Sequence, residues 1–102
     1  MRRRFGMAVL LCMACAASQA ETHVIVIENM RFSPQSLTVS AGDRIVWENK
    51  DLFPHTASAN DREFDSGNIA SQASWTYVAG SPGEYRYHCA YHPTMTATLT
   101  VR

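Results

Sequence analysis

The sequence predicts an all-β domain, a β-sandwich of about seven short strands. Runs of β-branched and aromatic residues alternate with turn residues, and the turns recur about every eight to twelve positions. No helical period of useful length is present, and we expect at most one short turn of helix within residues 66–74. There is no internal repeat and no linker, so the pattern indicates a single domain.

Turn residues bound each expected strand, and alternation sets the direction of the side chains. Tyr85, Tyr87 and Cys89 share one face of a strand, while Arg86 and His88 lie on the other. The last strand has apolar residues at odd positions and threonine at even ones, which is typical of a half-buried strand. The strands are expected at residues 24–27, 37–40, 45–48, 75–78, 85–89 and 95–101.

The first twenty residues have the pattern of a cleaved signal peptide. Arginines at positions 2–4 precede an apolar stretch over about residues 5–17, and Ser18-Gln19-Ala20 offers small residues for cleavage near Ala20. The alternative, a membrane anchor, is disfavoured because a membrane span needs roughly 20 apolar residues. We therefore expect residues 1–20 to be removed and residues 21–102 to form an exported, periplasmic domain.

Removal of residues 1–20 changes the charge and the cysteine count. Six basic and nine acidic side chains remain, a net charge of −3, which excludes the basic face that nucleic-acid binding requires. Acylation of Cys15 is a further alternative, disfavoured because Cys12 stands where an aliphatic residue is expected. After cleavage Cys89 is the sole cysteine, whereas small exported domains usually carry cysteines in pairs. A lone thiol in an oxidising compartment is explained by burial or by a bound metal.

One short segment gathers ligand types that suit copper. Cys89, His92 and Met95 supply a thiolate, an imidazole and a thioether at three-residue spacing between the last two expected strands. A thiolate, two imidazoles and a weak thioether are the ligands of a trigonal copper site. Structural zinc sites instead favour several cysteines. The segment lacks only the second imidazole.

Three other histidines are available for this position. Strand alternation directs His88 to the opposite face, and His23 lies close to the cleavage point in a segment that we expect to fray. His55 follows a proline on a loop that we expect beside the 89–95 loop, at one end of the sandwich. It is therefore the remaining candidate.

These motifs resemble those of the cupredoxins, the small type 1 blue-copper proteins, and the spacing is most similar to the amicyanins within that family. The specific signal is the Cys-x-x-His-Pro-x-Met loop at residues 89–95 together with an upstream Pro-His at residues 54–55. The resemblance covers nearly all of residues 21–102. Other segments that carry it are Phe32-Ser33-Pro34, Ala41-Gly42-Asp43, Trp47, Phe64-Asp65-Ser66-Gly67 and residues 83–89.

The resemblance implies a Greek-key β-sandwich that binds one copper ion, cycling between Cu(I) and Cu(II). It implies no enzyme activity and no small-molecule substrate, but transfer of single electrons between redox partner proteins that dock transiently near His92. We expect a monomer. The alternative is a periplasmic protein that binds or delivers copper. The implied metal ligands are His55, Cys89, His92 and Met95, and the implied apolar docking surface is Phe53, Pro54, Tyr91 and Pro93.

Two positions depart from the family pattern. Thr56 stands where amicyanin-like sequences often have asparagine, a residue that helps to tie the two ligand loops together. Tyr91 stands where many relatives have proline. We therefore expect hydrogen bonding around the Cys89 sulfur, and with it the reduction potential, to differ from those of relatives.

Overall fold

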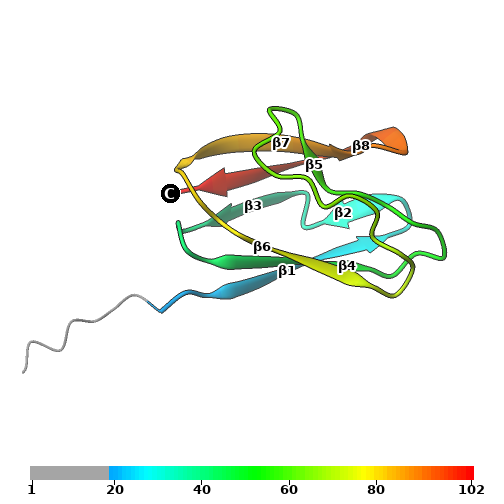
Figure 1. The fold of residues 1–102 in the computed structure, drawn as a ribbon, viewed down its shortest axis with the longest axis horizontal. Helices are drawn as coiled ribbons and strands as arrows, with labels where there is room; N and C mark the ends of the chain where they lie inside the picture. The colour runs from blue at the N-terminus through cyan, green and yellow to red at the C-terminus, as the bar shows by residue number, and fades with distance from the viewer. Residues whose placement is uncertain (1–18) are drawn as a thin grey trace, which may run out of the picture.

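The structure is a computed structural model that describes residues 19–102, which form two facing β-sheets (Figure 1). The strand orders are β2-β1-β4-β6 in one sheet and β3-β8-β7-β5 in the other. The predicted all-β sandwich is confirmed, with eight strands in place of about seven. The strands are β1 (Thr22–Glu28), β2 (Arg31–Ser33), β3 (Ser36–Val39), β4 (Arg44–Asn49), β5 (Ser58–Ala59), β6 (Ser74–Val78), β7 (Gly83–Cys89) and β8 (His92–Val101).

The predicted signal peptide, residues 1–20, lies outside the described residues except for Gln19 and Ala20. In the described part of the chain, no helix has the length and apolar character needed to cross a membrane.

No turn of helix forms within residues 66–74, where the sequence allows at most one. This segment runs alongside the loop that carries His55, and the two are joined by backbone hydrogen bonds. His55 N donates to Ile69 O at 3.1 Å, and Ile69 N donates to His55 O at 2.7 Å. Because these groups pair with another loop, they are not available for hydrogen bonds within a helical turn.

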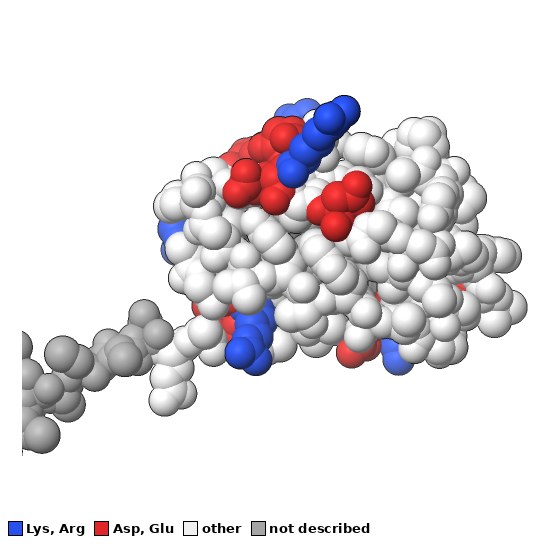
Figure 2. Space-filling model, viewed as in Figure 1, with Lys and Arg blue, Asp and Glu red and all other residues white. Residues whose placement is uncertain are grey.

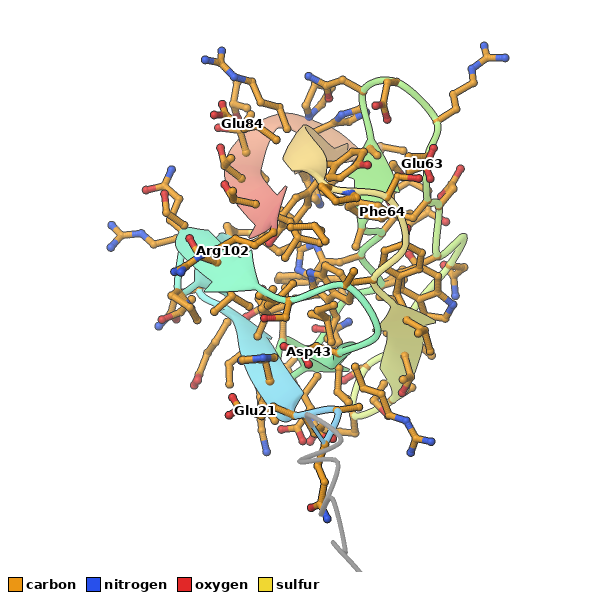
Figure 3. All side chains as sticks on the ribbon, turned by 90° about the vertical axis from the view of Figure 1, so that its left-hand side faces the viewer. Glu21, Asp43, Glu63, Phe64, Glu84 and Arg102 are labelled. Carbon is orange, nitrogen blue, oxygen red and sulfur yellow. The ribbon has the colours of Figure 1, made fainter. Side chains whose placement is uncertain are left out.

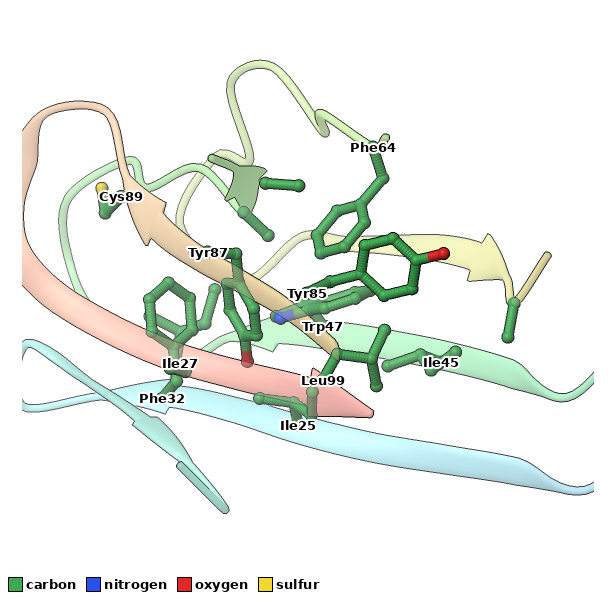
Figure 4. Close-up of a cluster of buried hydrophobic side chains, with 14 of the residues drawn as sticks. Ile25, Ile27, Phe32, Ile45, Trp47, Phe64, Tyr85, Tyr87, Cys89 and Leu99 are labelled. Atoms are coloured by element: carbon green, nitrogen blue, oxygen red, sulfur yellow. The ribbon is translucent and has the colours of Figure 1, made fainter. Parts of the chain in front are cut away.

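The core lies between the sheets and is rich in aromatic rings. Alternation on β4 buries Ile45 and Trp47, and the parallel pairing of β1 with β4 places Ile25 opposite Trp47. The ring of Trp47 meets that of Tyr87 edge to face, with centroids 5.6 Å apart, a favoured aromatic geometry. Figure 4 shows these rings together, with Cys89 at the edge of the cluster.

The turn of the β7–β8 hairpin lies at one end of the sandwich, opposite the end that carries the termini of the described chain (Figure 1). As the sequence predicts, Tyr85, Tyr87 and Cys89 are buried on β7, whereas His88 is half-buried and its Nδ1 lies 2.7 Å from Asn60 Oδ1. The register shifts next to Cys89: His88 pairs with Thr96, but Cys89 pairs with His92. Residues 93–95 therefore have no partner on β7 and form an irregular stretch beside Cys89.

Candidate metal centre

Three of the four predicted ligands come together at this end of the sandwich. The Nδ1 atom of His55 lies 3.6 Å from the Sγ atom of Cys89. The rings of His55 and His92 have centroids 5.4 Å apart and planes at 61°. His55 and Cys89 are fully buried, with 0% exposure, while His92 is half-buried. The side chains therefore form a cluster that is closed to water except toward His92.

The backbone explains this convergence. His55 lies on the loop between β4 and β5 and is held by its hydrogen bonds to Ile69. Cys89 ends β7, and its partner His92 begins β8, so the tight hairpin places both beside the His55 loop. The expected proximity of the two loops is thus observed.

The fourth predicted ligand, Met95, is buried on β8 with 5% exposure. It belongs to the same apolar cluster as Cys89 and lies in the irregular stretch of residues 93–95. Its burial suits an axial thioether ligand, and it also suits a core methionine that fills an irregular space. The assignment of Met95 as a ligand stays a prediction.

Asp51 contacts the candidate ligand His55 on the side away from Cys89. Its Oδ2 atom lies 2.7 Å from His55 Nε2. The same carboxylate accepts hydrogen bonds from the backbone N–H groups of Asn29 at 2.8 Å and Met30 at 3.1 Å. Burial by itself would raise the pKa of the Asp51 carboxyl, but the hydrogen bonds from Met30, His55 and Asn29 outweigh it and lower that pKa.

Sequence reasoning missed Asp51, because Asn49-Lys50-Asp51 has the pattern of an ordinary turn. The available signal was a carboxylate four residues before a candidate ligand. Metal-binding histidines commonly donate their second ring N–H to such a group.

Thr56 connects the two ligand loops. Its backbone N–H donates to Cys89 Sγ at 3.4 Å, and its hydroxyl oxygen accepts a hydrogen bond from Ala90 N at 2.7 Å. The threonine hydroxyl thus provides the link between the loops. The Tyr91 hydroxyl donates to Asn68 Oδ1 at 2.9 Å and is directed toward the 66–74 segment.

The donor set fits a copper ion. Because His55 Nε2 faces a carboxylate, it carries the proton of the neutral ring, which leaves Nδ1 with a free lone pair. Bonds of the length found at zinc sites, about 2.0–2.1 Å to nitrogen and about 2.3 Å to thiolate, place two ligand atoms of one ion about 3.6–3.8 Å apart for tetrahedral to trigonal angles. The observed separation of Nδ1 and Sγ is 3.6 Å. The two atoms therefore already stand at the distance expected for ligands of one ion.

A second group of possible metal ligands lies at the opposite end, where Figure 3 shows Glu21 and Asp43 close together. Asp43 accepts hydrogen bonds from the backbone N–H groups of Glu21 at 3.0 Å and Ser40 at 2.9 Å, and His23 Nε2 lies 2.9 Å from its Oδ2. These hydrogen bonds occupy both carboxylate oxygens of Asp43. We therefore assign Glu21, His23 and Asp43 a structural role and call them the clasp. The expected fraying of His23 is a wrong prediction, because β1 pairs with β4 from Thr22 onward.

Comparison with known proteins identifies the family. Residues 4–101 match the family described as Cupredoxin-like domain. Amicyanin from Paracoccus versutus is 25% identical, with 86% of this chain and 70% of the relative covered. Plastocyanin from Scenedesmus fuscus is 32% identical, with 70% of this chain and 86% of the relative covered.

Solved structures agree with this relationship. A purple cupredoxin from Nitrosopumilus maritimus has a TM-score of 0.73 at 26% identity, covering 78% of this chain and 99% of that one. A copper-containing nitrite reductase from Thermus scotoductus has a TM-score of 0.75 at 22% identity, which shows a shared fold. This chain covers 23% of the reductase. The chain belongs to the cupredoxin family, a family of electron-transfer copper proteins.

Proposed function

We propose that this chain is a periplasmic type 1 copper protein that shuttles single electrons between redox partner proteins. The observation that carries the proposal is the 3.6 Å approach of His55 Nδ1 to Cys89 Sγ, between two fully buried side chains. Export to the periplasm is proposed from the signal-peptide pattern of residues 1–20. The proposed ligands of the copper ion are His55, Cys89, His92 and Met95.

The surroundings of the proposed ligands suit electron transfer. A copper ion held by these residues would take up one electron as Cu(II) and release it as Cu(I). Cys89 and His55 are shielded from water, and the Thr56 N–H directed at the Cys89 sulfur reduces the charge density on a thiolate there. Four protein ligands leave no position open to a substrate, so we propose a carrier and not an enzyme.

The surface beside His92 suits brief contact with other proteins. Phe53 and Tyr91 are exposed by 54% and 50%, and Pro54 and Pro93 are also exposed. On the face shown in Figure 2, charged side chains gather toward the other end of the molecule, and the end with the β7–β8 hairpin carries few. Transient redox complexes have contact areas at the low end of the range for protein interfaces, so a patch of a few exposed apolar side chains suits them. We propose that partners dock here and that His92 is the point of electron entry or exit.

Copper delivery is the alternative function. A delivery protein needs ligands that exchange readily, whereas His55 and Cys89 are both 0% exposed. Their burial favours slow exchange of the metal and therefore the electron carrier.

Voltammetry combined with a copper-exchange assay tests the proposal. The copper-loaded chain should cycle reversibly by one electron and should lose Cu(I) slowly to a competing chelator. His88→Ala is the matched control, since His88 neighbours Cys89 but bonds to Asn60, and this variant should behave like the wild type. A protein that has no reversible couple and transfers Cu(I) quickly would contradict the carrier and support delivery.

A further inference from the structure

We propose that Asp51 is a positioning residue for the metal centre, which fixes the tautomer and orientation of His55 and lowers the reduction potential. The proposal rests on the copper function proposed above. It concerns the carboxylate that contacts His55 from behind, on the side of the ring away from Cys89.

The first step is the tautomer of His55. Its side chain has no exposed surface, and the Asp51 side chain is 10% exposed, so water does not compete strongly for the 2.7 Å contact between Nε2 and Oδ2. A carboxylate accepts hydrogen bonds, and Nε2 must therefore donate one. In the neutral ring, Nδ1 is then left without a proton, at 3.6 Å from Cys89 Sγ. Asp51 thus selects the form of His55 that can bind metal together with Cys89.

The second step is the rigidity of Asp51 itself. The backbone N–H groups of Asn29 and Met30 both donate to the Asp51 carboxylate, at 2.8 and 3.1 Å. On its backbone, Asp51 N donates to Asn49 Oδ1 at 3.0 Å, and Asp51 O accepts from Ser71 Oγ at 2.6 Å. Contacts from three separate segments therefore hold the carboxylate in one place, and the imidazole with it.

The third step concerns charge. A carboxylate bonded to an imidazole makes the ring a stronger electron donor to a metal. The negative charge also attracts Cu(II) more strongly than Cu(I), because Coulomb attraction grows with the charge of the ion. Both effects favour the oxidised state and lower the reduction potential.

The turn at Asn29 and Met30 allows the two roles of Asp51 to be separated. Both residues have positive φ, 53° and 60°, in the two-residue connection between β1 and β2. Asn-Gly is the favoured pair for such a turn, so Met30→Gly should support the turn without help from Asp51. Asp51→Ala is therefore tested in the Met30→Gly background, with Met30→Gly alone as the reference. Asp61→Ala removes an exposed carboxylate that bonds to Glu63 N, and it serves as the charge-matched control.

The first measurement uses metal-free protein and does not depend on copper. Nitrogen-15 NMR of the His55 ring should show one tautomer, protonated at Nε2, in the wild type, in Met30→Gly and in Asp61→Ala. Asp51→Ala should give a mixture of tautomers. An unchanged single tautomer in Asp51→Ala, or a mixture already present in Met30→Gly, would overturn the proposal.

The second measurement uses the copper-loaded protein. Asp51→Ala should weaken Cu(II) binding by about 10- to 100-fold. The potential should rise by about 59 mV for each tenfold loss of Cu(II) affinity relative to Cu(I). If Asp51→Ala in the Met30→Gly background has the same reduction potential as Met30→Gly alone, the proposed role of Asp51 is wrong, although the proposed copper site still stands. Failure of the wild type to bind copper would instead refute the proposed function, and the NMR result would still decide the tautomer.

Discussion

Thr56 shows how a single hydroxyl supports the candidate centre. Its oxygen accepts a hydrogen bond from Ala90 N and lies 2.9 Å from Ser58 Oγ. Thr56→Val keeps the shape but leaves the Ala90 N–H without this partner, so the free energy of unfolding should fall by about 1–3 kcal/mol. Thr56→Ser keeps the hydroxyl and should retain most of the stability. Urea denaturation measures both, and equal stability of the two variants would contradict this account.

Asn49 has a comparable role in the loop that carries Asp51 and His55. Its amide donates to Phe53 O at 2.8 Å and to Ile69 O at 3.0 Å, and the side chain is almost fully buried. Asn49→Ala leaves these groups unpaired and should cost about 2–4 kcal/mol in the free energy of unfolding. Asn68→Ala, at an exposed position, should change it by about 0.5 kcal/mol or less. Chemical denaturation of both variants checks the difference, and similar losses would count against a structural role for Asn49.

At the scale of elements, the clasp at Asp43 joins the start of β1 to the turn between β3 and β4. Hydrogen bonds from Ser40 N, the His23 ring and Glu21 N stabilise the ionised carboxylate and lower the pKa of Asp43 below its usual value. The folded-state pKa thus lies below that of the unfolded chain. The stabilisation is fully present above the unfolded pKa of about 3.9 and is lost as the pH falls through the folded value.

Asp43→Asn should therefore lower the melting temperature near neutral pH. The difference in melting temperature between the wild type and the variant should narrow below about pH 4, where the wild-type carboxylate becomes protonated and loses its charge. Thermal unfolding followed by circular dichroism at a series of pH values measures the gap. A gap that stays constant through the acidic range would show that the charge of Asp43 does not contribute.

The longer strands could be predicted from the sequence, but the shortest could not. Alternation on β7 and β8 correctly gave the buried faces, because each strand has one side in the core. β2 and β5 have only three and two residues, too few for a periodic pattern. Their existence depends on pairing with β1 and β7, which is a property of the assembled fold.

At the scale of the whole molecule, the core contains two polar atoms that the aromatic packing leaves unpaired. Within residues 19–102, Trp47 Nε1 and the Tyr87 hydroxyl are buried without a hydrogen-bond partner. Burial also raises the pKa of Tyr87. Tyr87→Phe should leave the free energy of unfolding unchanged or raise it, because a desolvated hydroxyl is removed. Tyr87→Ala should lower the free energy of unfolding by about 3–5 kcal/mol, because it leaves a cavity in the core. If denaturation curves show a clear loss in the free energy of unfolding for Tyr87→Phe, the hydroxyl has a hydrogen-bond partner and this account is wrong.

The candidate centre was only partly predictable. The spacing of Cys89, His92 and Met95 is local, so it is visible in the sequence. His55 was reached by excluding other histidines, since its 3.6 Å approach to Cys89 is a contact across 34 positions. The bond between Asp51 and His55 depends on the exact course of one loop, which Asn49 sets from within the core.

The most direct test of the copper assignment is an optical titration of the purified protein with Cu(II). We predict intense visible thiolate-to-copper absorption that saturates at one equivalent in the wild type and in His88→Ala, and that is absent in Cys89→Ser. A wild-type protein that stays colourless with one equivalent of Cu(II), or a Cys89→Ser variant that retains the absorption, would contradict the assignment.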